Sequence, residues 1–416
     1  MQLNHPALNR VVITGMGAVS PFGPKVKELM DGLWRGDSAV CYHHEMTKVQ
    51  GLRCLVAAKV VGIDPKQIAR KHRRSMSHMS IYAILAAQEA LEQAGIGSEE
   101  CGSGRLGVAI GSTVASTEVS EAFFVDYLSD HSLERMKTTL FFQLMNHTCA
   151  ANVAQTYRIK GRILAPAAAC ATGSQGLGYG YEMIVAGHQD MMLCGGADEL
   201  HPLTSATFDV MHAASTGYND AAQQTPRPFS KDRDGMVCGE GSGVLLLESL
   251  TSARQRGAQI FGEIVGFATL SDPGSIANPD AAVMADCMRL ALENSGITAG
   301  QVDYVNAHAT ATDYGDIAES EAVAAIFGEH TPVSSLKGHL GHTMAACGAL
   351  ETIATLNMLN RGQLIPTLHL TEVDPRCAKL DYVREPQQRS MDIALKNNFA
   401  LGGVNTSLVL RRYTCD

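Results

Sequence analysis

The sequence lacks any uninterrupted apolar stretch of about 18 residues, the length expected of a membrane-spanning helix. Its most apolar segment, 163–187, is broken by Pro166 and several glycines. The N-terminus lacks the charged-then-apolar pattern of a signal peptide. Eleven cysteines are present but no C-x-x-C pair, which disfavours both a zinc site and a disulfide framework. We therefore expect a cytoplasmic protein without a membrane span and without a bound metal.

An excess of basic residues is also missing. The net charge of −9 argues against general nucleic-acid binding. Of the 416 residues, 45% are hydrophobic and 18% charged, a composition typical of a globular protein with an ample core. This length predicts two or three domains, or one large duplicated domain. A single tryptophan beside 40 glycines suggests many tight turns between strands and helices.

Short apolar runs alternate with longer segments of helical period along the chain. Strands are expected at 10–14, 106–111, 191–195, 244–248, 302–307, 332–335 and 406–410. Helices are expected at 75–94, 170–186, 281–295, 316–327 and 345–359. This alternation predicts an α/β protein with a mainly parallel sheet covered by helices. The near-continuous apolar character of the strands predicts burial on both faces.

One internal similarity indicates a duplication. The heptapeptides 90–96 and 291–297 are identical at five of seven positions, and each is followed by a polar stretch and an expected strand. Helices often end on glycine, so chance similarity is the alternative. The repeated helix–turn–strand order favours two related α/β halves, 1–255 and 256–416. No Pro/Ser-rich linker separates them, so we expect them to pack as one body.

Cys170 is the first candidate for chemistry. It lies where an apolar strand gives way to a helix rich in glycine and alanine. The positive end of a helix dipole favours the thiolate form of a cysteine placed there. The small neighbouring residues leave room for a bulky group to reach the sulfur. The alternative is an inert buried cysteine, which is how most free cysteines behave.

Three further segments place polar groups at the ends of expected strands. His308 is followed by Thr310 and Thr312, whose side chains point the same way from an extended segment. Lys337 and His342 are five residues apart with glycines between them, and a neighbouring lysine keeps a histidine neutral. The Gly-Gly pair 402–403 either presents backbone N–H groups to an anion or forms a tight turn. Parallel-sheet proteins place active sites at such strand ends.

These motifs identify a resemblance to the β-ketoacyl-acyl carrier protein synthases, closest to the elongating type with two histidines. It extends nearly end to end, through 11–17, 227–235, 239–243 and 402–405, with the Cys, Asn-Ala-His and Lys-x4-His motifs in the family's order. The resemblance implies a thiolase-type duplicated fold of five layers, αβαβα. It also implies a homodimer, or a heterodimer with a related ketosynthase-like subunit.

The resemblance implies a decarboxylative Claisen condensation with malonyl-acyl carrier protein. In that reaction Cys170 would carry the acyl group, and the backbone N–H groups of Cys170 and Leu401 would hold the oxyanion. His308 and His342 would stabilise the enolate formed by decarboxylation, and Lys337 would support them electrostatically. The product would be a 3-oxoacyl-acyl carrier protein of fatty-acid or polyketide synthesis.

Other positions match supporting roles in the family. Glu319 and Glu351 match acidic residues that orient the catalytic set, and Thr310 and Thr312 match contacts to the phosphopantetheine arm of the carrier. No cofactor bound to the enzyme itself is expected. The basic run in this acidic chain matches the surface where the acidic carrier docks, and the residues expected there are Arg70, Lys71, Arg73, Arg74 and Lys137.

The sequence departs from the family at the acyl pocket. The usual Gly-Phe gate is Ala400-Leu401 here, so the bulky aromatic that opens the pocket is absent. Phe208 and Phe399 are expected to line this pocket together with Ala400 and Leu401. The loop 271–280 is shorter than usual. These changes suggest a specialised enzyme of polyene or other secondary-metabolite synthesis, and they leave chain length undefined.

Several other functions remain as alternatives. A chain-length factor, the non-elongating partner subunit, lacks the cysteine that is present here. The single-histidine branch is disfavoured by the Lys337-x4-His342 motif. A papain-like hydrolase needs neither a second histidine nor the lysine, and an inactive carrier-binding scaffold needs none of these groups.

Overall fold

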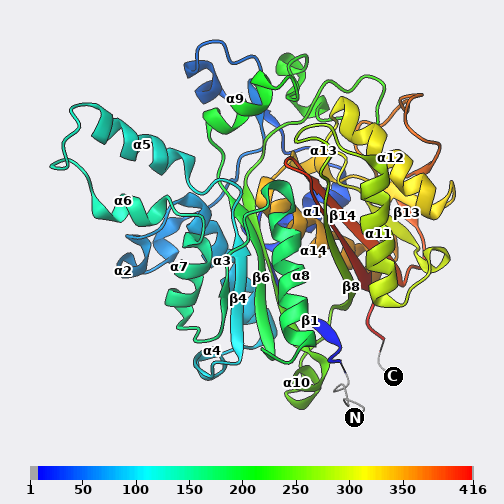
Figure 1. Cartoon of the computed structure of the whole chain (residues 1–416), viewed down its shortest axis with the longest axis horizontal. Helices are drawn as coiled ribbons and strands as arrows, with labels where there is room; N and C mark the ends of the chain where they lie inside the picture. The colour runs from blue at the N-terminus through cyan, green and yellow to red at the C-terminus, as the bar shows by residue number, and fades with distance from the viewer. Residues whose placement is uncertain (1–7, 415–416) are drawn as a thin grey trace.

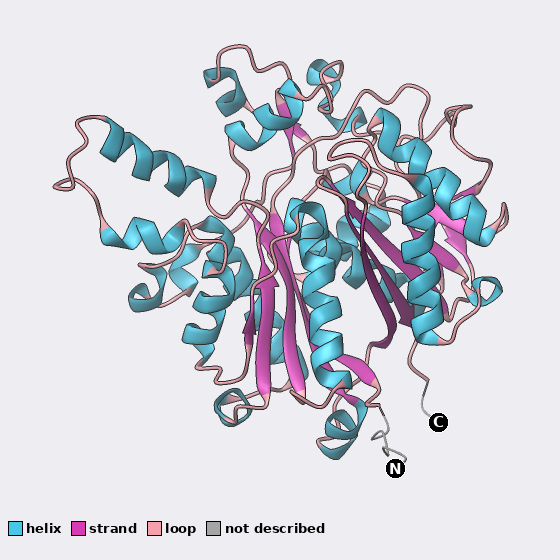
Figure 2. Ribbon diagram, viewed as in Figure 1, coloured by secondary structure: helices cyan, strands magenta, loops and turns pink. Residues whose placement is uncertain are grey.

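The computed structural model describes residues 8–414, and most of its strands belong to one large sheet (Figures 1 and 2). In hydrogen-bonded order this sheet contains β12 (Asp381–Tyr382), β10 (Pro332–Ser334), β9 (Tyr304–Asn306), β14 (Ile393–Ala400), β15 (Val404–Arg411), β8 (Gly262–Ser271), β1 (Val11–Val19), β7 (Gly241–Ser249), β6 (Met191–Asp198), β4 (Leu106–Gly111) and β5 (Ile163–Leu164). Two small sheets pair β2 (Cys41–Tyr42) with β3 (Val56–Ala57), and β11 (Gln363–Leu364) with β13 (Gln387–Gln388).

The strand order confirms the duplication. One repeat contributes β1, β4, β5, β6 and β7, and the other contributes β8, β9, β10, β14 and β15. In both repeats the strands lie in the sheet in the order third, second, fourth, fifth, first. The first strands, β1 and β8, pair antiparallel and join the two repeats. The proposed division at residue 255 itself stays a prediction.

The expectation of a mainly parallel sheet is wrong. Within each repeat the third, second and fourth strands are parallel, but the fifth is antiparallel to both of its neighbours. In the second repeat the reason is a short turn, because β14 runs directly into β15 without a crossover helix. The expected burial of the strands is confirmed, since every residue of β1, β4, β6 and β7 is buried.

The helices complete the five layers that were expected (Figure 1). α3 (His78–Ala94) and α7 (Thr148–Tyr157) cover the outer face of the first repeat. α11 (Ala281–Ser295) and α12 (Asp313–Phe327) cover that of the second. Between the repeats lie α8 (Thr172–Val185) and α14 (Cys347–Arg361), and each contacts strands of both.

The apolar core follows these layers. The central cluster joins Leu177 of α8 and Ile353 of α14 to strands of both repeats, and a fully buried side chain of this size contributes about 2 kcal/mol. Separate clusters lie under α3 and α7 and under α11 and α12. Because the two middle helices share one core, the groups at their N-termini are held at a fixed spacing.

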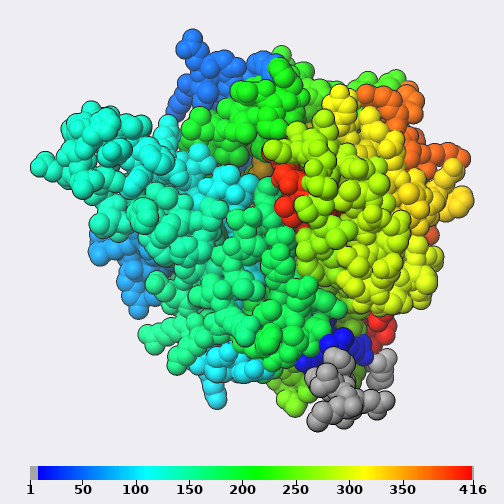
Figure 3. Space-filling model, in the orientation of Figure 1, coloured from blue at the N-terminus to red at the C-terminus, as the bar shows by residue number. Residues whose placement is uncertain are grey.

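All but one of the remaining helices lie at the periphery. They are α1 (Val26–Arg35), α2 (Arg70–Arg73), α4 (Ser98–Gly102), α5 (Thr117–Leu128), α6 (Thr138–Gln143), α9 (Pro202–Val210) and α10 (Leu250–Gln255). The exception is α13 (Lys337–Leu340), whose residues are all buried. The segment containing α5 and α6 projects from the body as an arm (Figures 1 and 3), and none of the described residues of these two helices is buried. Within residues 8–414, no helix has the length and apolar character needed to cross a membrane.

Candidate active site

Cys170 lies directly before α8, in the short 3-10 turn η3 (Ala169–Ala171). The preceding residue, Ala169, has a φ of 47°, a left-handed conformation that costs a non-glycine residue about 1–2 kcal/mol. One turn further on, a Cβ atom on Gly173 would lie only 2.4 Å from the carbonyl oxygen of Ala345. The glycine therefore lets α8 approach the segment that precedes α14, and the strained turn directs the sulfur toward it.

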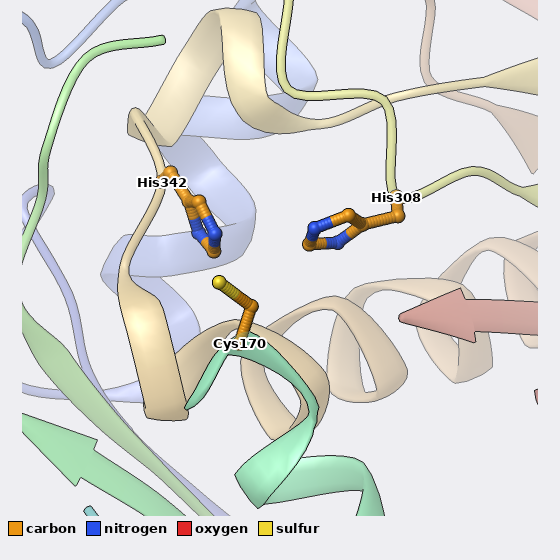
Figure 4. A group of neighbouring side chains, drawn as sticks. All are labelled: Cys170, His308 and His342. Carbon is orange, nitrogen blue, oxygen red and sulfur yellow. The ribbon is translucent and has the colours of Figure 1, made fainter. Parts of the chain in front are cut away.

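Two histidines from the second repeat face this sulfur. His308 follows β9 and His342 follows α13. One nitrogen of each ring and the Cys170 Sγ all lie within 4.8 Å of one another. The ring centroids are 5.2 Å apart with an angle of 82° between the rings, and both rings point toward the sulfur (Figure 4). The structure thus brings together a thiol and two imidazoles that are far apart in the sequence.

A cavity of about 470 Å³ contains all three groups in its lining. The predicted residues Thr310 and Thr312 also line it, and their hydroxyl oxygens are 3.0 Å apart. Their side chains therefore point the same way, as expected. The residue Cys170 as a whole is 6% exposed and lines the cavity, so the site is buried but open to a ligand through this cavity.

The helix terminus favours the thiolate as expected, but it does not ionise Cys170 in the unliganded site. Burial raises the pKa of the Cys170 thiol to about 12. The Lys337 ammonium and the backbone N–H groups of Cys170 and Leu401 act in the opposite direction, but they do not outweigh burial. The resting group is therefore a thiol with two backbone N–H groups beside it.

The Gly402–Gly403 pair forms a tight turn and does not supply the anion-binding N–H groups. Both residues have positive φ, at 88° and 76°, which glycine adopts without strain. The Gly402 N–H donates to the carbonyl of Ile276, and the Gly403 N–H donates to that of Ala400. The turn instead presents the N–H of Leu401 to the thiol of Cys170.

Hydrogen bonds indicate which nitrogen of each histidine carries the proton. The backbone N–H of Met344 donates to Nδ1 of His342 over 3.3 Å, and the Nε2 atom is buried with no protein partner in the described structure. Nδ1 of His308 lies 3.1 Å from the amide nitrogen of Asn398. Since both Nδ1 atoms face donors, both protons reside on Nε2. Each ring thereby offers one N–H donor to a ligand.

Both imidazoles are neutral. Burial is the largest factor lowering the pKa of His308 and of His342 well below the usual range, and the positive charges of Lys337 and Lys396 lower both further. Neutral rings are the form that the sequence predicted. Two uncharged N–H donors converging on one point suit an oxygen that becomes negative during a reaction.

Glu351 lies between two buried lysines, one of which the sequence reasoning missed. Lys337 Nζ donates to Glu351 Oε1 over 2.7 Å, and Lys396 Nζ is 2.7 Å from Oε2. Burial opposes the charge on Lys337, but Glu351 outweighs it and leaves the pKa raised. Burial lowers the pKa of Lys396, which Glu351 opposes. A lysine within the apolar segment 393–400 was the sequence signal for this second cation.

Asn398 was also missed, and it links Lys396 to His308. Its Oδ1 accepts hydrogen bonds from Lys396 Nζ over 2.9 Å and from the Ser174 hydroxyl over 2.6 Å. Its amide nitrogen faces Nδ1 of His308 and also donates to the sulfur of Cys347 over 3.2 Å. All of these groups are buried, so the amide is held in one orientation.

Glu319 holds the backbone of the His308 loop. Its carboxylate accepts the N–H groups of His308 and Ala309 over 2.8 and 2.6 Å. Burial raises the pKa of Glu319 to about 7, although these hydrogen bonds lower it in part. The expected supporting role is therefore a contact to the main chain of His308 rather than to its ring.

The thiol and two imidazoles also have the composition and spacing of a metal-ligand set. The electrostatics oppose this use, because both Nε2 atoms carry protons and two buried ammonium groups lie nearby. A metal would require a change of tautomer at each ring and would face net positive charge. These residues suit a developing anion better than a cation.

The remaining predicted residues lie around the cavity or at the surface. The cavity is also lined by Phe208 of α9, Phe399, Ala400 and Leu401. The basic residues lie outside it, in and after α2 and at the start of α6. Gln143 of α6 donates to the carbonyl of Arg74, which brings the helix of Lys137 beside the basic run. None of the five predicted docking residues forms an ion pair in the described structure. These residues are Arg70, Lys71, Arg73, Arg74 and Lys137.

Comparison with known proteins agrees with this geometry. Residues 8–253 match the family model for the β-ketoacyl synthase N-terminal domain, and residues 261–371 match the model for its C-terminal domain. The chain is 33% identical over 408 residues to 3-oxoacyl-[acyl-carrier-protein] synthase 1 of Escherichia coli (strain K12), covering 97% of this chain and 99% of that protein.

Two solved structures are similar over nearly the whole chain. A β-ketoacyl synthase from Burkholderia phymatum STM815 superposes with a TM-score of 0.95 at 45% identity, covering 98% of this chain and 100% of the other. The ishigamide ketosynthase/chain length factor superposes with a TM-score of 0.91 at 31% identity, with the same coverage.

Proposed function

This chain belongs to the β-ketoacyl synthase family, and from that premise we propose how its residues perform decarboxylative Claisen condensation. It is a 3-oxoacyl-[acyl-carrier-protein] synthase, an acyltransferase that extends carrier-bound acyl chains in fatty-acid or polyketide synthesis. The observation that carries the residue assignment is the convergence of one thiol and two neutral imidazoles on a single cavity.

In the first step, the sulfur of Cys170 attacks the thioester carbonyl of an acyl carrier. The new carbon–sulfur bond replaces the one to the carrier, and the proton of the Cys170 thiol leaves with the carrier's thiol. Transfer between two thioesters is nearly isoenergetic, so thiol chemistry suits a waiting acyl group. The N–H groups of Cys170 and Leu401 stabilise the oxyanion of this step.

In the second step, malonyl carrier binds and loses its carboxylate as CO2. The electron pair of the broken bond moves onto the thioester oxygen as an enolate, which accepts hydrogen bonds from Nε2–H of His308 and His342. The enolate carbon then attacks the acyl group on Cys170. The thioester bond to Cys170 breaks, its sulfur regains a proton from solvent, and a 3-oxoacyl carrier leaves. Burial, assisted by the charge of Lys337, keeps both rings neutral.

The carrier would dock on the basic run at α2 and deliver its phosphopantetheine arm past Thr310 and Thr312. The five basic side chains around α2 and α6 form no ion pair with the residues that the structure describes, and they complement an acidic carrier. Such contacts mainly raise the rate of association. The acyl chain would enter the part of the cavity lined by Phe208, Phe399 and Leu401. With Leu401 in place of an aromatic residue, less side chain has to move to admit it.

The arm is proposed to bind a second copy of this chain. It exposes Phe124, Val125, Leu128, Leu133 and Phe141, each at least 54% exposed. Scattered apolar residues are normal on a surface, but five on one projecting segment favour an interface. The name of the ishigamide structure pairs a ketosynthase with a chain length factor. Binding of a related subunit in place of a second copy is therefore the alternative outcome of the experiment below. Light scattering of the purified chain and of Leu128→Glu distinguishes a dimer from a monomer. Separately, we propose a cytoplasmic location for this protein.

Intact mass spectrometry tests the proposed reaction. After mixing with acyl carrier, the enzyme gains the mass of one acyl group, and peptide mapping places that group on Cys170. Addition of malonyl carrier then removes it and yields the 3-oxoacyl carrier. A chain-length factor or a scaffold would gain no mass, and a hydrolase would release free acid. Acyl transfer that persists in Cys170→Ala would refute the assignment.

A further inference from the structure

Lys396 is a fully buried lysine in the middle of β14, and it is absent from the described lining of the cavity. Its Nζ atom ion-pairs with Glu351 and donates to Asn398 Oδ1 and to the carbonyl of Asn397. Substrate in the cavity therefore does not contact Lys396. Any effect of this residue on the reaction passes through the groups that it holds.

The charge balance around Lys396 argues against a purely structural role. Lys337 already pairs with Oε1 of Glu351, so Lys396 adds a second buried ammonium to a single carboxylate. Burying a surplus charge is expensive, and an apolar residue of similar size is often at least as favourable at such a position. A function that an apolar side chain cannot supply would account for the lysine at this site.

That function follows from the hydrogen-bonding capacity of the groups around Asn398. Its amide has four side-chain partners in the described structure: Lys396, Ser174, His308 and Cys347. A hydroxyl, a neutral imidazole and a thiol can each donate or accept, whereas an ammonium group can only donate. Lys396 is therefore the partner that decides which end of the amide carries the oxygen.

Once the oxygen faces Lys396, the amide nitrogen must face His308. The amide N–H then donates to Nδ1, and the ring proton resides on Nε2. We propose that Lys396 is a positioning residue that acts through Asn398 to keep the proton of His308 on the nitrogen that stabilises the enolate. This inference rests on the proposed decarboxylation, and it assigns to the Lys396–Asn398 pair the choice of tautomer at one of its two donors.

Histidine NMR tests the proposal directly. In protein labelled with 15N in its histidine rings, the His308 signals are identified by their loss in His308→Gln, and they report which nitrogen carries the proton. In wild type we expect Nε2–H. In Lys396→Met the amide is free to turn its oxygen toward Nδ1, so we expect a population with Nδ1–H. Ser174→Ala removes the other hydrogen bond to the same amide oxygen but leaves Lys396, so it is the matched control and should retain Nε2–H.

Two rates measured on the same variants separate positioning from general damage. The rate of decarboxylation of malonyl carrier should fall by about tenfold to a hundredfold in Lys396→Met. The upper end corresponds to complete loss of one hydrogen-bond donor to the oxyanion. Acylation of Cys170, which needs no His308 donor, should fall much less. Ser174→Ala should stay close to wild type in both rates. If Lys396→Met does not fold, Asn398→Leu, which leaves the Lys396–Glu351 pair intact, should give the same tautomer change and the same selective loss.

A wild-type tautomer and wild-type decarboxylation in folded Lys396→Met would overturn the proposal. So would an equal change of tautomer in Ser174→Ala, because Lys396 would then not be the deciding partner. Both activities are measured in the wild-type enzyme before any variant is compared. If the wild-type enzyme neither acylates Cys170 nor decarboxylates malonyl carrier, the proposed function itself is refuted.

Discussion

Replacing His342 with alanine should separate the two half-reactions. The Nε2 atom of His342 is buried without a protein partner in the described structure, and the ring points toward the sulfur in the shared cavity (Figure 4). Acylation uses the N–H groups beside Cys170, whereas the enolate needs the imidazole donors. His342→Ala should therefore still accept an acyl group on Cys170 but should decarboxylate malonyl carrier poorly.

The expected loss follows from the number of donors removed. Loss of one preorganised donor to an oxyanion costs about 2.7–4 kcal/mol, which is about 10²–10³ in rate. His308 keeps its own N–H, because the Asn398 contact that fixes its tautomer does not involve His342. The residual decarboxylation should therefore be measurable. Cys170→Ala gives the opposite pattern, with no acylation but continued decarboxylation.

Two assays measure these outcomes on the same protein. Intact mass spectrometry follows the acyl group on the enzyme, and chromatography follows the conversion of malonyl carrier to acetyl carrier. Thermal unfolding of both variants shows that each is folded under the assay conditions. Decarboxylation within about threefold of wild type in His342→Ala, when a loss of at least about a hundredfold is expected, would refute the reasoning. A parallel loss of both half-reactions would refute it as well.

Other perturbations test other parts of the site. Because burial raises the pKa of the Cys170 thiol to about 12, the thiolate fraction should grow about tenfold per pH unit between roughly pH 6 and 9; iodoacetamide labelling should rise accordingly, and a plateau in that range would contradict the assignment. The double charge reversal Arg70→Glu with Arg74→Glu should raise the KM for acyl carrier and weaken its salt dependence while leaving kcat nearly unchanged, whereas an unchanged KM would exclude docking there. Leu401→Phe should slow acylation by long acyl chains more than by short ones in a competition assay, and equal slowing would show that this residue does not gate the pocket.

Much of the fold could be predicted because it rests on local pattern. The apolar period of 281–295 defines α11 from its first residue to its last. The repeated heptapeptide correctly indicated equivalent helices before equivalent strands, since α3 precedes β4 and α11 precedes β9. Helical periodicity and helix-ending glycines are properties of adjacent residues, so they can be read without knowledge of the neighbours in space.

Strand β14 could not be predicted in this way, for the same reason that two site residues were missed. Lys396, Asn397 and Asn398 lie within it, and asparagine and lysine are depleted in strands. The strand forms because β9 and β15 pair with it on both sides, and because Glu351 and Ser174 satisfy its polar side chains. Residues that violate the local pattern are those that serve the site, and their partners come from distant parts of the chain.

The state of the thiol illustrates the same limit. Its place at a helix N-terminus was correct, but the expected thiolate was not, because burial of Cys170 outweighs the local dipole. Burial depends on the packing of β14 and the His342 loop around η3, which the sequence around Cys170 does not encode. Local sequence therefore located the nucleophile but did not predict its protonation.

The first repeat contributes the thiol of the proposed site and the second contributes both rings, so we expect that neither repeat catalyses the reaction by itself. The two repeats are thus complementary in the side chains that they bring to the cavity. A substitution in the packed seam between α8 and α14 alters the spacing of sulfur and nitrogen without touching either. We therefore expect substitutions that change the preferred chain length to lie in the cavity wall rather than in that seam.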